Sequence, residues 1–198
     1  VDHAYANGVT HYDTAWNYHN EKSAVAIGEL LKKYPRESFT LANKMPGWLI
    51  TGPEKAKELF YNHVKHVVSR TNTVTGKAYK DDPAIFSWQI GNEPRCFRND
   101  PEGQAAFVDF MWTSAAMIKS LDPNHMVSSG SEGSWGCEND MGLYERIHSC
   151  PDIDYMNIHI WPYNWSWVRE NTLKTNLPIA IENTDKYIDE HLALAAKY

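Results

Sequence analysis

The architecture of this chain is set at Trp88-Gln89-Ile90-Gly91-Asn92-Glu93-Pro94-Arg95, where a short apolar run ends in polar side chains and a proline. The apolar run begins at residue 84 and predicts a buried strand. The proline ends the pairing of this strand, because it has no N–H to donate to a neighbouring strand. Asn92 and Glu93 are therefore expected at the carboxyl end of the strand. A carboxylic acid in a dry position of that kind would have a raised pKa, which suits proton donation. The simpler interpretation is an ion pair between Glu93 and Arg95.

On both sides of this strand, short apolar runs alternate with amphipathic stretches. Strands are predicted at residues 8–13, 38–43, 84–91, 125–130 and 154–160, and helices at residues 21–34, 53–70, 104–121 and 183–198. This alternation indicates a parallel sheet with crossover helices. A doubly wound sheet is disfavoured because no glycine-rich phosphate fingerprint follows the first strand.

A barrel fits better, because polar residues collect at the strand ends, where barrel enzymes place their chemistry. These residues are Asp13, Lys44, Asn92, Glu93, Glu132, His159 and Trp161. A closed barrel needs eight strands and about 250 residues. The predicted fold class is therefore α/β: a partial (β/α)8 (TIM) barrel of about five parallel strands.

Composition narrows the function classes. The net charge is -6 and the basic residues are scattered, which disfavours binding to nucleic acid or to an anionic membrane. No run approaches the roughly 20 apolar residues of a spanning helix, and no signal-peptide layout opens the sequence. The three cysteines, Cys96, Cys137 and Cys150, have no paired metal-ligand spacing. They are interpreted as buried thiols, and one disulfide between two of them remains an alternative. Eight Trp and eleven Tyr suit either a sugar site or an aromatic core.

Several motifs between about residues 60 and 198 resemble those of glycoside hydrolase family 5 endo-β-1,4-mannanases. They are Arg70-Thr71-Asn72, Thr75-Gly76, Tyr79, Asp81-Asp82-Pro83, Asn92-Glu93-Pro94-Arg95, Ser129-Gly130-Ser131-Glu132-Gly133, and residues 154–162 with Asn164-Trp165. The resemblance implies a retaining mechanism, a polysaccharide substrate, no cofactor, and a secreted or periplasmic location.

The resemblance also implies roles for individual residues. Glu93 matches the acid/base, Asn92 would contact the sugar 2-hydroxyl, and His159 would sit near the catalytic carboxylates. Trp161 and Trp165 would shape sugar subsites. Three alternatives stay open: a packed structural role for His159, core packing for Trp165, and, for Glu132, either orienting the site or bracing its loop.

The family's nucleophile is expected at the end of a seventh strand, and here the sequence departs from the pattern. Glu182, in Pro178-Ile179-Ala180-Ile181-Glu182, mimics a strand-end glutamate, but a predicted helix follows it too closely. Retaining hydrolysis needs a second carboxylate about 5 Å from the acid/base. The chain is therefore expected to be inactive by itself.

The first 58 residues resemble a different barrel family, the aldo-keto reductases. The matching positions are Gly8, Asp13-Thr14-Ala15, Tyr18, Glu21, Ile27-Gly28 and residues 41–44. The resemblance implies that Tyr18 donates a proton, with Asp13 and Lys44 tuning its pKa, and that NADPH binds. The expected organisation is one partial barrel over residues 1–198, reductase-like over 1–58 and mannanase-like over 59–198. A carbonyl reductase, or a non-catalytic chimera that self-associates to cover open sheet edges, are the alternatives.

Overall fold

The computed structural model describes residues 1–14, 18–20, 22–42 and 53–198. The chain divides into two compact units, Val1–Phe60 and Tyr61–Tyr198. This division is one of packing, and it does not bear on the ancestry of either part. Among the described residues, no helix is both long and apolar enough to cross a membrane.

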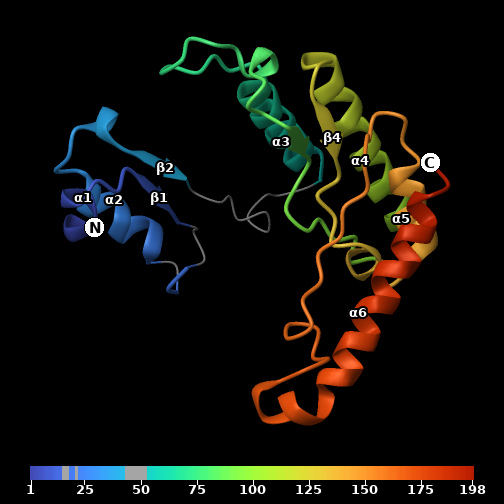
Figure 1. Cartoon of the computed structure of the whole chain (residues 1–198). Coiled ribbons are helices and arrows are strands. Elements are labelled where there is room, and N and C mark those ends of the chain that lie inside the picture. The colour runs from blue at the N-terminus through green and yellow to red at the C-terminus, as the bar shows by residue number, and fades with distance from the viewer. Residues whose placement is uncertain (15–17, 21, 43–52) are drawn as a thin grey trace. The chain divides into compact units, whose positions relative to one another are not determined.

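The first unit contains a parallel strand pair flanked by short helices (Figure 1). Its core holds Tyr12, Leu31 and Phe39. Within the unit, the apolar side chains of the second helix are only partly buried: Leu31 is in the core, whereas Val25 and Leu30 are exposed. A two-stranded sheet is too narrow to cover a full helical stripe. The elements are α1 (Asp2–Ala6), β1 (His11–Asp13), α2 (Ser23–Leu31), η1 (Arg36–Ser38), β2 (Thr40–Ala42) and the start of α3 (Pro53–Val68).

The second unit is built around β3 (Ser87–Gln89) and β4 (Met126–Ser128), which pair in parallel with Trp88 opposite Val127. The crossover between them is α4 (Pro101–Leu121), which packs against β4 and α5 (Met141–His148) (Figure 1). The helix begins three residues before the predicted start, because the Asp100 side chain accepts from the Gly103 N–H and a proline occupies the first position. Short 3-10 turns complete the unit: η3 (Tyr79–Asp81), η4 (Ser134–Cys137) and η5 (Glu170–Thr172).

The strand predicted at residues 154–160 is wrong in one respect: the segment is extended but forms no regular ladder. It lies along β4 and donates one backbone hydrogen bond from Asp154 to the Val127 carbonyl, 2.9 Å. The His159 N–H donates a second backbone hydrogen bond, to the Glu132 carbonyl at 3.4 Å, and side chains make the contacts between these two. The Asp154 carboxylate accepts from Val127 N–H, while the Asn157 amide accepts from Gly130 N–H and donates to the Ser131 carbonyl. The described residues therefore contain four short strands rather than five.

The last helix, α6 (Leu173–Ala195), starts ten residues before the predicted position and includes Pro178. Glu182 lies inside this helix and is exposed, so it is not a strand-end carboxylate. Leu192 of this helix is exposed. The face that packs inward carries Ala180, Tyr187, His191 and Leu194, at helical spacing.

Candidate active site

Glu93 follows β3, and the end of β4 fixes its backbone. Its N–H donates to the Gly130 carbonyl, 2.9 Å, and it adopts a left-handed conformation at φ 52°. A non-glycine residue rarely adopts this conformation outside a constrained site. Gly130 is also left-handed, and a Cβ there would collide with the Gly91 carbonyl oxygen. Glycine at this position thus permits the close approach that places Glu93 beside the loop following β4.

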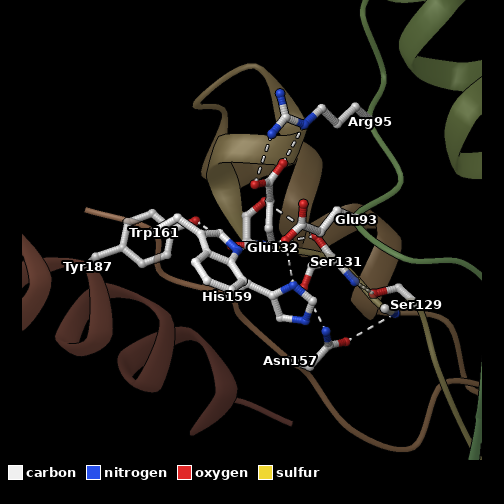
Figure 2. A network of polar contacts seen from close by, with 11 residues as sticks. Glu93, Arg95, Ser129, Ser131, Glu132, Asn157, His159, Trp161 and Tyr187 are labelled. Atoms are coloured by element: carbon white, nitrogen blue, oxygen red, sulfur yellow. Dashed lines mark hydrogen bonds and ion pairs between the residues drawn. The ribbon is translucent and has the colours of Figure 1, made fainter. Parts of the chain in front are cut away.

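Two side chains from the extended segment converge on the Glu93 carboxylate (Figure 2). His159 Nδ1 and the Trp161 indole N–H each lie 2.8 Å from Oε1. Within the described part of the chain, both hydrogen bonds to this carboxylate reach Oε1, and Oε2 accepts none. The Glu93 side chain is 23% exposed, so solvent reaches the carboxylate.

The pKa of Glu93 is shifted in the direction opposite to the one expected from the sequence: it is lowered rather than raised. The hydrogen bond with His159 has the largest effect and lowers the pKa, burial opposes it, and the Trp161 hydrogen bond lowers the pKa again, so that it lies below the usual value. The expected raised pKa is therefore wrong for this chain. Its premise was a dry carboxyl, whereas the side chain is partly exposed and its ionised form is hydrogen-bonded.

Glu132 is the second strand-end glutamate, and it is fully buried. Arg95 holds it in a two-pronged ion pair, with Nε 2.5 Å from Oε1 and Nη2 3.1 Å from Oε2 (Figure 2). The simpler interpretation of Glu93, as the ion-pair partner of Arg95, is therefore wrong. Arg95 joins the Glu93 loop to the Glu132 loop.

Helix α6 clamps the loop that carries Glu132. The Tyr187 hydroxyl donates to the Glu132 carbonyl, 2.7 Å, and accepts from the Trp135 N–H, 3.2 Å. His191 Nε2 accepts from the Ser134 N–H, 2.9 Å, so Nδ1 carries the proton and donates to the Tyr187 carbonyl. Burial lowers the pKa of His191, which keeps the ring neutral for this role. Gly133 has φ 101°, and a Cβ there would strike both side chains, so glycine is required.

The two tryptophans predicted to shape subsites differ sharply. Trp161 is 49% exposed beside Glu93, whereas Trp165 is only 7% exposed. The Trp165 ring stacks on Trp135 at a centroid distance of 4.7 Å and contacts Trp167 and Tyr187. Trp165 is thus part of an aromatic core, and only Trp161 offers an open ring surface. Asn92 is exposed next to Glu93.

Sequence reasoning missed Asn157, Tyr187 and His191. Asn157 had a signal, since it is an amide in the middle of a predicted strand. Tyr187 and His191 stand four residues apart in the predicted helix 183–198 and therefore share one of its faces, but the sequence does not show which loop that face contacts. Among the described residues, no group of three or more His, Cys, Asp or Glu side chains is arranged to hold a metal ion.

The structure describes only part of the reductase-like set. Asp13 lies in β1, and Tyr18 is 41% exposed in a turn. Lys44 falls outside the described residues. The proposed pKa tuning of Tyr18 therefore stays a prediction.

Solved structures with a similar fold define the class of protein first. A variant of the glycoside hydrolase family 5 mannosidase from Rhizomucor miehei, in complex with mannosyl-fructose, superimposes with a TM-score of 0.61 and 33% identity. The match covers 73% of this chain and 31% of that one. The endo-beta-1,4-mannanase from Thermotoga petrophila superimposes with a TM-score of 0.58 and 25% identity, over 73% of this chain and 32% of that one. The fold is that of the (β/α)-barrel glycosidases.

Sequence comparison then gives the family. A family model described as GH family 5 beta-mannosidase-like matches residues 5–198, so the chain belongs to glycoside hydrolase family 5 and is mannanase-like. Mannan endo-1,4-beta-mannosidase 1 of Arabidopsis thaliana is 40% identical over 122 residues, which are 55% of this chain and 29% of that protein. Mannan endo-1,4-beta-mannosidase 4 of Oryza sativa subsp. japonica is 42% identical over 125 residues, which are 56% of this chain and 26% of that protein. The chain spans less than a third of the length of these relatives.

The family match includes nearly all of the segment predicted to be reductase-like. It begins at residue 5, and no comparison supports an aldo-keto reductase origin for residues 1–58 or a junction near residue 59. The two families share barrel architecture, so short strand-end stretches such as the one containing Asp13 can coincide without common function. The reductase activity and its NADPH site are therefore not favoured.

Proposed function

We propose that this chain supplies the acid/base half of a retaining site that cleaves β-1,4-mannan internally. The observation that carries the proposal is the placement of Glu93: a strand-end carboxylate with one oxygen held by His159 and Trp161 and the other without a hydrogen bond among the described residues. The exposed Trp161 ring beside it offers a flat apolar surface, which suits a pyranose face. The relatives' names supply the substrate class.

The lowered pKa of Glu93 fits one half of the acid/base cycle directly. An ionised Glu93 can act as the base that activates water in the second step. Protonating a leaving group in the first step needs a higher pKa. A second carboxylate about 5 Å away would provide it, because two like charges at that distance disfavour each other's ionisation.

Neither of the other glutamates considered from the sequence can be that second carboxylate. Glu132 is buried with both oxygens held by Arg95, and Glu182 is exposed on α6. We therefore expect these 198 residues to bind mannan oligosaccharides without hydrolysing them. Asn92 would contact the sugar 2-hydroxyl and Trp161 would stack on the ring, while Trp165 has a packing role. Self-association that covers the open sheet edges stays a prediction.

The test combines hydrolysis and binding. Release of reducing ends from β-1,4-mannan is measured for the chain and for Glu93→Gln, with Glu182→Gln as the matched control, and mannotetraose binding is followed by tryptophan fluorescence. We expect no release from any of the three, and binding that Trp161→Ala abolishes. Hydrolysis that survives Glu93→Gln would refute the role of Glu93. Hydrolysis that Glu93→Gln removes would keep that role and refute the expected inactivity.

A further inference from the structure

Two of the three cysteines lie on the two loops that Arg95 and Glu132 join. Cys96 belongs to the loop after β3, and Cys137 ends η4, in the loop after β4. The Cys96 N–H donates to the Gly136 carbonyl, 3.2 Å. This bond places the Cys96 backbone against the peptide group that joins Gly136 to Cys137. Standard bond lengths then limit the separation of the two Cα atoms to at most about 7 Å, the upper end of the range for disulfides.

The electrostatics of the two thiols also indicate proximity and distinguish their roles. Burial raises the pKa of Cys137 to about 12, and the neighbouring Cys96 thiol is the next largest cause of the rise. Cys137 is 1% exposed, whereas Cys96 is partly exposed, with Sγ 3.4 Å from the Arg98 carbonyl. Cys96 is therefore the thiol that a solvent-borne oxidant meets first, and Cys137 is positioned to react with it afterwards.

We propose that Cys96 and Cys137 form a disulfide that ties the acid/base loop to the loop carrying Glu132. The co-reactant is a small-molecule disulfide such as oxidised glutathione. The Cys96 thiolate attacks it and releases one thiol, leaving a mixed disulfide at Cys96. Cys137 then loses its proton, attacks Sγ of Cys96 and releases the second thiol. Two protein thiols are oxidised and one oxidised glutathione is reduced to two thiols.

The site has a physical consequence that is separate from the proposed glycosidase activity. The covalent link would run parallel to the Arg95–Glu132 ion pair and would join the same two loops. A link between residues 96 and 137 closes a long loop, which restricts the unfolded chain. The oxidised chain should therefore resist heat better than the reduced chain, by about 5 °C in Tm.

Trypsin separates the three cysteines, which makes the test direct. Cys96 falls in the peptide of residues 96–98, Cys137 in residues 120–146 and Cys150 in residues 147–169. The chain is equilibrated with oxidised and reduced glutathione, alkylated, digested without reductant and analysed by mass spectrometry, with free thiols counted in denaturant. We expect the count to fall from three to one and peptides 96–98 and 120–146 to appear joined, two hydrogens lighter than their sum.

Variants control for folding and for the order of steps. Cys150→Ser should retain the link, and Cys96→Ser should lose it; because Cys96 is partly exposed, that variant should fold even if Cys137→Ser does not. Early samples should show glutathione on Cys96, since the high pKa of Cys137 slows the second step. A thiol count that stays at three, a glutathione adduct that never resolves, or a link to Cys150 would overturn the proposal.

Discussion

Glu93 and Glu132 occupy equivalent places and have opposite environments. Each follows one strand of the β3–β4 pair. Glu93 is partly exposed and is hydrogen-bonded through one oxygen by His159 and Trp161. Glu132 is fully buried, and Arg95 holds both its oxygens. Position at a strand end therefore does not by itself identify a catalytic carboxylate.

The difference lies in what each carboxylate can still do. An arginine fork binds both oxygens of a carboxylate and keeps its own charge, because the guanidinium does not lose its proton. An imidazole and an indole on one oxygen leave the other oxygen available for exchange of a proton with a ligand. The buried ion pair thus holds the two loops together, and the partly exposed glutamate remains available for chemistry.

The largest expected effect separates the two halves of the ion pair. Arg95→Met leaves the Glu132 carboxylate buried without its partner, and we expect a loss of about 3–5 kcal/mol in the free energy of unfolding. Glu132→Gln leaves an arginine whose side chain is 37% exposed and can turn to water, so the loss should be smaller, about 1–3 kcal/mol. Urea unfolding monitored by circular dichroism measures both.

The matched control is Arg98→Met. Arg98 also pairs with a carboxylate, Asp100, but both side chains are exposed. Its replacement should change the free energy of unfolding far less than that of Arg95, because solvent screens the exposed pair. A loss for Glu132→Gln equal to or above that for Arg95→Met would contradict the burial argument.

A smaller effect is expected where α6 holds the Glu132 loop. Tyr187→Phe removes the hydroxyl that donates to the Glu132 carbonyl and accepts from Trp135. The Trp135 N–H then loses that partner, and the Glu132 carbonyl keeps only the 3.4 Å contact from the His159 N–H. We expect a loss of about 1–2 kcal/mol, from the same urea measurement. Tyr163→Phe is the control, because the Tyr163 ring is exposed; its effect should stay within about 0.5 kcal/mol. Equal losses in the two variants would exclude a clamping role for Tyr187.

The sequence was sufficient to place the residues that meet at Glu93. Strand-end side chains of neighbouring parallel strands converge, so Glu93, His159 and Trp161 could be expected together. The partner of Arg95 could not, because it depends on the close approach of Gly91 and Gly130 and on the path of a loop. Tyr187 and His191 lie within the helix predicted at residues 183–198, but their partners depend on how that helix packs on the Glu132 loop, which local sequence does not determine. The earlier start of α6 was missed because Pro178, Ile179 and Ile181 disfavour a helix by local propensity, whereas the structure continues the helix through them.

The smallest expected effect concerns the titration of Glu93. Its pKa is lowered in the folded chain, so its ionisation stabilises the fold above the ordinary glutamate pKa and this contribution is lost as the pH falls through the folded value. His159→Phe removes the largest cause of the shift and should raise the pKa of Glu93 towards its usual value, with less than about 1 kcal/mol lost at neutral pH. Carbon-13 titration of the side-chain carboxyls measures the pKa, with the Glu93 resonance identified by its disappearance in Glu93→Gln.

Trp161→Phe, which removes the second donor, should shift the pKa in the same direction by less. If the pKa of Glu93 is unchanged in His159→Phe, the imidazole does not hold this carboxylate. Glu93 and Glu132 would then differ only in how deeply they are buried.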